Sequence, residues 1–270
     1  MLEVDSLEKT FNSGTANEVQ ALQGASFQLP EGSFMVVIGG NGSGKSTLLN
    51  AVAGSFIVDS GRITLDGHEI TRWPEHRRAR LIGRVFQDPY SGTAPQMSIG
   101  ENLALAARRG MHRGLGWALS GRIRDEMRER VSSLNMGLED RLDTPIGSLS
   151  GGQRQALTLL MATWLRPRLL LLDEHTAALD PRSAQQVVEL TARIIEEQKL
   201  TALMVTHSMQ QAVNLGDRLV MVHRGRILHD FTGARKRRLK STDLLSLFDE
   251  IRRMEQLDEA AALMLRDLYV

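Results

Sequence analysis

The chain has 270 residues, a length that predicts one principal domain with an inserted or appended piece. It carries 33 basic and 32 acidic side chains, a formal net charge of +1, and this balance gives no electrostatic footprint for nucleic acid. It has no cysteine, which excludes disulfides, thiolate metal sites and thiol catalysis and is typical of a reducing compartment such as the cytosol.

The N-terminal third alternates between two kinds of apolar pattern. The segments "LEVDSLEKTF", "ALQGASFQL" and "GRITLDG" are short and alternating and close at Gly, Asn or Pro, which predicts an antiparallel β lobe. Between them, "SFMVVIGG" (Ser33–Gly40) is continuously apolar, and "STLLNAVAG" repeats apolar residues at helical spacing. This order predicts a buried strand, a loop and a helix.

From about Ser98 to Trp164 the pattern is helical, and we expect an inserted helical lobe at about 90–165. Strands and helices then alternate, which indicates a mostly parallel sheet in an α/β fold. The successive segments are "RLLLLD", a helix over 183–198, "TALMVTH", a helix over 208–215 and "RLVMVHRGRIL".

The tail, 231–270, is predicted to be a short helical extension that packs on its own core or on a partner. Ser241 or Thr242 is the expected N-cap, and six apolar residues fall on one helical face. They are Leu244, Phe248, Ile251, Met254, Leu257 and Ala261.

Two basic segments have two interpretations each. "ARKRRLK" is suited to anionic lipid or nucleic acid, although in a neutral protein a solvated surface is the favoured interpretation. "RRGMHRGLGWALSGRIR", with Trp117, is either a surface near lipid headgroups or an ordinary lobe loop, which we favour.

The segment "GGNGSGKST" has the spacing of a phosphate-binding loop between the predicted strand and helix. Glycines let successive N–H groups point at phosphate oxygens, and the helix N-terminus adds positive potential. We expect Lys45 to neutralise the β- and γ-phosphates and Ser46 to hold Mg²⁺. The alternative is a Gly-rich turn with a chance lysine. The predicted nucleotide-binding residues are Gly39, Gly40, Asn41, Gly42, Ser43, Gly44, Lys45, Ser46 and Thr47.

Two adjacent acids end the apolar run "LLLL". We expect their strand to lie beside the strand of the phosphate loop, so that both carboxylates reach the ligand edge of the sheet. Asp173 would reach Mg²⁺, and Glu174 would orient and polarise the attacking water. An exposed turn after an edge strand is the weaker alternative, because four leucines imply a strand covered on both faces.

A second helix start suited to an anion follows from "SLSGGQRQ". Because one phosphate loop already exists, this second site makes sense if it serves a nucleotide held by another copy of the chain. The residues concerned are Ser150, Gly151, Gly152 and Gln153.

These motifs make residues 1–230 resemble an ATP-binding cassette (ABC) ATPase, the nucleotide-binding subunit of an ABC transporter. "GGNGSGKST" resembles Walker A, "VFQDP" the Q-loop, "LSGGQ" the signature, "LLLLDE" Walker B, "AALD" the D-loop and "THS" the switch histidine. The resemblance implies a P-loop NTPase fold with a RecA-like core, an antiparallel β lobe, an inserted helical lobe and ATP and Mg²⁺ as ligands.

The resemblance also assigns roles to four further residues. Phe11 would stack on adenine, although a strand-end core phenylalanine is the alternative. Gln87 would touch Mg²⁺ and the attacking water, and His207 would hydrogen-bond the γ-phosphate, a capping histidine being its alternative. Asp180 would lie between two cassettes, cap the following helix, or do both.

The implied function is ATP hydrolysis that energises solute transport through a separate permease, at the cytoplasmic face of the membrane. Two copies would close head to tail over two ATP molecules. Separate chains resemble bacterial importers that use a solute-binding receptor, and "DEHTAALDP" resembles cassettes paired with permeases of the branched-chain amino acid type, which suggests an amino acid-like solute. The alternatives are a single-cassette ATPase of assembly or repair without a permease, and a nucleotide-binding module without turnover.

His175 stands where many members of this family have proline. We interpret it as a mark of a subfamily with a structural or hydrogen-bonding role, because the imidazole expected at the γ-phosphate is that of His207.

Overall fold

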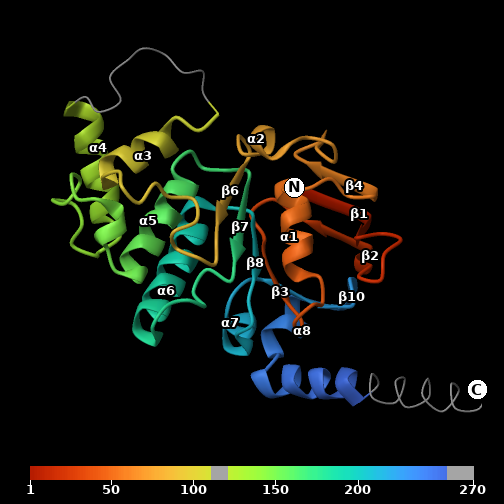
Figure 1. Ribbon diagram of the computed structural model, residues 1–270. Helices are drawn as coiled ribbons and strands as arrows, with labels where there is room; N and C mark the ends of the chain where they lie inside the picture. Colours follow the sequence, from red (N-terminus) through yellow and green to blue (C-terminus); the bar gives the residue numbers. More distant parts are fainter. Residues whose placement is uncertain (111–120, 254–270) are drawn as a thin grey trace, which may run out of the picture.

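The computed structural model describes residues 1–110 and 121–253, which form two β-sheets and the helices around them (Figure 1). The strands are β1 Leu2–Phe11, β2 Val19–Leu29, β3 Phe34–Ile38, β4 Ser60–Leu65, β5 His68–Glu69, β6 Ile82–Val85, β7 Leu169–Asp173, β8 Ala202–Val205, β9 Arg218–His223 and β10 Arg226–Thr232. The helices are α1 Lys45–Ala53, α2 Glu75–Arg78, α3 Ile99–Ala107, α4 Gly121–Ser132, the 3₁₀ turn Ile146–Ser148, α5 Gly151–Thr163, α6 Pro181–Gln198, α7 Met209–Asn214 and α8 Gly233–Arg238.

One sheet is antiparallel and the other is mostly parallel, as predicted. The antiparallel sheet has the order β2-β1-β4-β5, and the other has the order β10-β9-β3-β8-β7-β6. In the second sheet only β9 and β10 pair antiparallel. They are joined through Arg224 and Gly225, both with positive φ, which suits a tight hairpin turn.

The strands of the parallel sheet are buried on both faces. Along β7, Leu170 and Leu172 face the core that contains α5 and α6, whereas Leu169 and Leu171 face the core shared with α1 and the antiparallel sheet. The run of four leucines therefore serves two cores, and the polar residues that follow it emerge at the carboxyl edge of the sheet.

Two features of this sheet depart from the sequence analysis. The prediction that β7 lies beside β3 is wrong, because β8 lies between them. Strand β6, at the edge, was not predicted, because it is only four residues long and contains a glycine and an arginine. Its Gly83 packs so closely on α5 that an added Cβ would lie 2.5 Å from the Ala162 carbonyl oxygen.

The helical lobe contains α3, α4 and α5, which lie on the side of the molecule away from the antiparallel sheet (Figure 1). Ser98 and Glu101 form a reciprocal capping box at the start of α3, which satisfies two backbone N–H groups that a helix start leaves free. Trp117, on which the two interpretations of its basic segment depend, lies outside the described residues.

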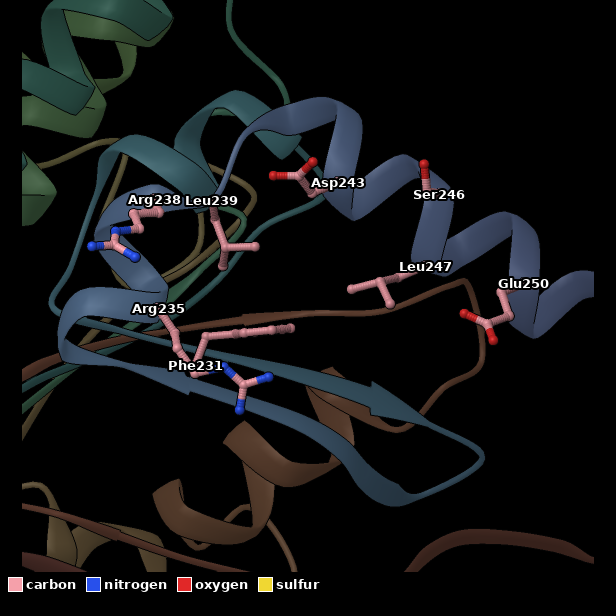
Figure 2. Close-up of a pocket in the computed structure, with 8 residues that line it drawn as sticks. All are labelled: Phe231, Arg235, Arg238, Leu239, Asp243, Ser246, Leu247 and Glu250. Carbon is pink, nitrogen blue, oxygen red and sulfur yellow. The ribbon is translucent and has the colours of Figure 1, made fainter.

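The C-terminal extension packs on the core of its own chain, which is one of the two arrangements predicted for it. Residues 241–253 are helical, Leu244 is fully buried, and Leu247 and Phe248 pack against the core cluster that covers β7 and β8. Figure 2 shows Leu239 and Leu247 between the two helices of the extension, above Phe231.

Three predictions about the extension have different outcomes. The expected N-cap at Ser241 or Thr242 is wrong, because the helix already includes both and Asp243 accepts a hydrogen bond from the Lys240 N–H. The basic segment is not a uniformly solvated surface, since Lys236 is buried and donates to the Val213 carbonyl at 2.7 Å. Met254, Leu257 and Ala261 lie outside the described residues.

Candidate active site

The phosphate-binding motif lies where its chemistry requires, between the end of β3 and the start of α1. The loop is held from outside, because the Gly225 N–H donates to the Ser43 carbonyl at 2.8 Å and the Gln23 N–H donates to the Gly225 carbonyl at 2.9 Å. Strand β2 and the β9–β10 turn therefore keep the loop in one shape. Such support lets backbone N–H groups point at a ligand without further ordering.

Two glycines of the loop are required by close packing. A Cβ at Gly39 would clash with the Val222 carbonyl, and one at Gly44 would clash with the Ala21 carbonyl. Gly44 also has a φ of 102°, in the region that favours glycine. It is the N-cap of α1 and has no side chain to cap the helix, so the first N–H groups of α1 stay open to a ligand.

Lys45 is buried at the start of α1 and donates from Nζ to the carbonyl oxygens of Gly39 and Gly40, at 3.0 and 2.9 Å. Burial lowers the pKa of Lys45, and the carboxylates of Glu174 and Asp173 oppose that shift. The lysine thus holds a desolvated positive charge beside the two acids, without a direct ion pair to either among the described residues.

Asp173 ends β7 and faces Arg84 of β6. The distance from Arg84 Nη2 to Asp173 Oδ2 is 3.4 Å. Burial raises the pKa of Asp173, while Arg84 and Lys45 act in the opposite direction. A divalent cation at this carboxylate would add to the charge that keeps it ionised.

Glu174 and His207 meet at the carboxyl edge of the sheet. Glu174 Oε1 lies 2.6 Å from His207 Nε2, with the acid largely buried and 46% of the histidine side chain exposed. Glu174 has a φ of 45°, uncommon for a residue with a side chain. Backbone conformations of this kind persist where the surrounding structure holds them, and they cluster at functional sites.

His175 points away from this pair into the core. Its side chain is 1% exposed, and Nε2 lies 3.0 Å from Thr191 Oγ1 of α6. Burial lowers the pKa of His175 to about 4, so the ring is neutral at pH 7. The predicted structural, hydrogen-bonding role of His175 is therefore confirmed.

Phe11 is half-buried at the end of β1, and Gln87 is exposed. The Phe11 ring packs edge to face on Phe56, with centroids 5.3 Å apart, and Lys9 Nζ lies 5.5 Å from its centroid. Gln87 follows β6 by two residues. Ser46 is exposed at the start of α1 and Thr47 is half-buried.

The signature segment starts α5, apart from the phosphate loop. Ser150 accepts a hydrogen bond from the Gln153 N–H, and the Gln153 side chain accepts one from the Ser150 N–H, so the helix start is capped by its own residues. A Cβ at Gly152 would lie 2.8 Å from the Ser183 Cβ, which sets α5 close to the start of α6. Asp180 caps α6, accepting from the Ser183 N–H at 3.1 Å, as predicted.

The residues at the loop fit a nucleotide and a magnesium ion. Ser43 Oγ is buried and lacks a hydrogen-bond partner within residues 1–110 and 121–253, and the glycines leave a cradle that side chains would fill. No group of three or more acids and histidines is placed to hold a metal in that part of the chain. Ser46 and Asp173 carry the oxygen ligands that Mg²⁺ prefers, and Mg²⁺ is commonly bound by one or two such protein ligands together with phosphate oxygens and water.

Sequence reasoning missed three side chains that position these motifs. Arg84 joins β6 to Asp173, and Gln155 of α5 donates to the Phe86 carbonyl at 3.0 Å, next to Gln87. Arg154 is buried and donates to the Ile146, Gly147 and Leu149 carbonyls just before the signature. Arg84 could have been found from the sequence, because it is a charged residue within a short apolar strand. Arg154 and Gln155 directly follow the signature, and the spacing of that motif does not say which groups their side chains contact.

Comparison with known proteins agrees with this geometry. A model of the family "ABC transporter" matches residues 22–177, more than half of the chain. The tyrosine transport ATP-binding protein of Clostridioides difficile is 40% identical over 249 residues, covering 92% of this chain and 99% of that relative. A methionine import ATP-binding protein of Rhodopseudomonas palustris is 36% identical over 84% of this chain, which spans 59% of that relative.

Solved structures show the same fold. An ATP-binding cassette dimer in a post-hydrolysis state with ADP and Pi superposes with a TM-score of 0.72 at 26% identity, covering 86% of this chain and 98% of that one. An ADP-bound cassette gives the same TM-score and identity and is covered over 91% of its length. Within residues 1–110 and 121–253, no helix is long and apolar enough to cross a membrane. The chain therefore belongs to the ABC transporter family and is one of its ATP-hydrolysing cassettes, a subunit peripheral to the membrane.

Proposed function

We propose that this cassette hydrolyses ATP to energise the import of an amino acid-like solute through a separate permease. The observation that supports the catalytic part is the contact between Glu174 Oε1 and His207 Nε2, which are 2.6 Å apart at the carboxyl edge of the sheet. The charges of Asp173 and Glu174 act on Lys45 at the same edge. A buried lysine at the start of α1, together with two acids and an imidazole at the ends of β7 and β8, provides groups of the kind that phosphoryl transfer to water uses.

Each group has a distinct role in this proposal. The loop N–H groups and Lys45 bind the phosphates, with the Lys45 ammonium exchanging its carbonyl partners for phosphate oxygens. Ser46, Asp173 and Gln87 are the residues that would hold Mg²⁺, whose charge neutralises the phosphates when it is bound. Glu174 accepts a proton from the attacking water, and His207 holds that carboxylate and the γ-phosphate in place. Phe11 offers its ring to adenine.

A second copy of the chain completes each site. Ser150, Gly151, Gly152 and Gln153 form the start of α5, apart from the phosphate loop of the same subunit, and Asp180 lies exposed at the adjacent helix start. The dimeric cassette structures support a head-to-tail homodimer in which these residues face the nucleotide held by the partner. ATP would favour the closed dimer because its γ-phosphate contacts both subunits.

The permease would dock on the helical lobe, in a groove of about 470 Å³ between β6, α3 and α5. Phe86, Leu105 and Met161 give the groove an apolar lining, and 56% of Leu105 is exposed. Arg84 lines the same groove and reaches Asp173. Docking there would place the permease one side chain away from the proposed magnesium ligand, at the cytoplasmic face of the membrane.

The proposed solute class rests on relatives. The tyrosine transport relative aligns with this chain over 99% of its own length, and a methionine import relative also matches. These names support an amino acid as the solute, and delivery by a separate receptor is a further part of the proposal. The narrower prediction of a permease of the branched-chain amino acid type is tested by identifying the permease that co-purifies with the cassette.

The decisive experiment compares the wild type with Glu174→Gln. We expect the variant to bind ATP and to dimerise with it, but to lose phosphate release by at least about 10²-fold, because the amide cannot accept the proton. Hydrolysis at the wild-type rate would show that the assignment of Glu174 is wrong.

A further inference from the structure

The side chain of Gln211, on α7, bridges the two chain segments that carry Glu174 and His207. Its Oε1 accepts a hydrogen bond from Thr206 Oγ1 at 2.8 Å, and its Nε2 donates to Thr176 Oγ1 at 3.1 Å. Thr206 directly precedes His207, and Thr176 follows Glu174 by two residues. One amide group therefore joins the flanks of the proposed catalytic pair.

Both ends of this bridge are tied to further groups. Thr206 Oγ1 also accepts from the Ser208 N–H at 3.1 Å, on the far side of His207. On the other flank, His175 Nε2 meets Thr191 Oγ1, whose hydroxyl lies 2.7 Å from the Val187 carbonyl. Because that hydroxyl donates its single proton to the carbonyl, it accepts from the His175 ring, which anchors the turn after Glu174 to α6.

The two threonines of the bridge are buried, Gln211 between them is half-buried, and His207 is exposed. Thr176 and Thr206 are 7% and 4% exposed, whereas 46% of the His207 side chain is exposed. A hydrogen bond to a buried hydroxyl is costly to break, because the hydroxyl left behind has little access to water as a replacement partner. Packing alone does not hold the His207 ring, so the conformation of its neighbours sets its position.

We propose that Gln211 and Thr176 are positioning residues for hydrolysis, which hold the Glu174 carboxylate and the His207 imidazole in register. This inference rests on the proposed function, because it takes Glu174 and His207 as the groups that act on water. Neither positioning residue contacts the phosphate loop through any hydrogen bond of the described residues. Their loss should therefore slow the chemical step and leave ATP binding unchanged.

The test uses two substitutions at Thr176 in the full-length chain, of which valine matches the shape of threonine. Valine removes the hydroxyl that accepts from Gln211 and serine keeps it. We expect Thr176→Val to lower kcat by about tenfold with KM for ATP within about twofold, and Thr176→Ser to stay within about twofold in both constants. Equal kcat values for the two variants would overturn the proposal, as would a loss confined to KM.

A second arm uses Gln211→Met, with Gln210→Met as its matched control. Gln210 is the exposed neighbour on the same helix, so its replacement changes helix composition without touching the bridge. We expect Gln211→Met to lose about tenfold in kcat and Gln210→Met to keep the wild-type value. Because Gln211 lies on a partly exposed helix, this arm remains informative where a buried valine prevents folding.

The double variant Gln211→Met, Thr176→Val separates a shared hydrogen bond from two unrelated defects. If the two side chains act together, the double variant loses no more than about twofold beyond either single variant, whereas independent defects multiply. Glu174→Gln distinguishes the two levels of inference. If Glu174→Gln hydrolyses ATP normally, the proposed function fails. If Glu174→Gln is inactive and Thr176→Val is fully active, only the positioning role fails.

Discussion

Two histidines near Glu174 differ in almost every physical respect. His207 is 33 residues away along the chain, 46% exposed and 2.6 Å from the Glu174 carboxylate. His175 is the next residue along the chain, 1% exposed and hydrogen-bonded to a threonine of α6. The chain leaves β7 at Glu174, whose φ of 45° turns the backbone, so the neighbour in sequence enters the core while His207, two residues after the end of β8, reaches the site. Adjacency to a catalytic acid is therefore a poor guide to chemistry.

The largest expected effect is that of His207→Ala on hydrolysis. Removing the imidazole frees the Glu174 carboxylate from its hydrogen-bond partner and leaves the γ-phosphate without that contact, so kcat should fall on the order of 10²–10³-fold. ATP affinity, measured by equilibrium binding, should change little because the phosphate loop is intact. A variant that keeps more than a tenth of wild-type kcat would place His207 outside the chemistry.

The buried histidine should instead be visible in the pH dependence of stability. The pKa of His175 is lowered from 6.5 to about 4 by burial, so the unfolded state takes up a proton at a higher pH than the folded state. The contribution is fully present above pH 6.5 and is lost as the pH falls towards 4, which removes about 3 kcal/mol of unfolding free energy.

Urea unfolding at several pH values between 4 and 7 measures this loss, with His175→Gln as the control that retains every other titrating group. The wild type should lose stability more steeply than the variant as the pH falls. Parallel pH curves for the two proteins would show that His175 titrates in the folded state much as it does in the unfolded state.

His175→Pro tests the comparison directly, since proline is the residue that the family resemblance implies at this position. The change removes the hydrogen bond to Thr191 and leaves the exposed side of the site untouched, so kcat should fall by less than about tenfold, while stability drops by about 1–3 kcal/mol. Phosphate release measured beside His207→Ala gives the ranking. If His175→Pro is the less active of the two, the structural role assigned to His175 is wrong.

Local features of this site could be predicted from sequence, and long-range ones could not. The spacing of "GGNGSGKST" implied a strand, a loop and a helix, and "LLLLDE" implied a strand covered on both faces, because both patterns are local consequences of backbone geometry. The position of β8 between β3 and β7, the contact of Arg84 with Asp173 and the bridge made by Gln211 depend on which strands pair. Periodicity within a segment carries no information about the order of strands in a sheet. The motifs therefore predicted which residues act, whereas the contacts that position those residues became visible only in the structure.

The smallest expected effect is at Thr191, the partner of His175. Thr191→Val keeps the volume of the side chain but removes the acceptor for the His175 Nε2–H, which leaves a buried donor without a partner and should cost about 1 kcal/mol of unfolding free energy. Thr191→Ser keeps the hydroxyl and should lose less. Because this hydrogen bond is fully buried and joins the turn to α6 rather than to the Glu174–His207 pair, kcat should change by less than about threefold in both variants. A stability loss equal in the two variants would show that packing of the threonine methyl group, rather than the hydrogen bond, holds His175 in the core.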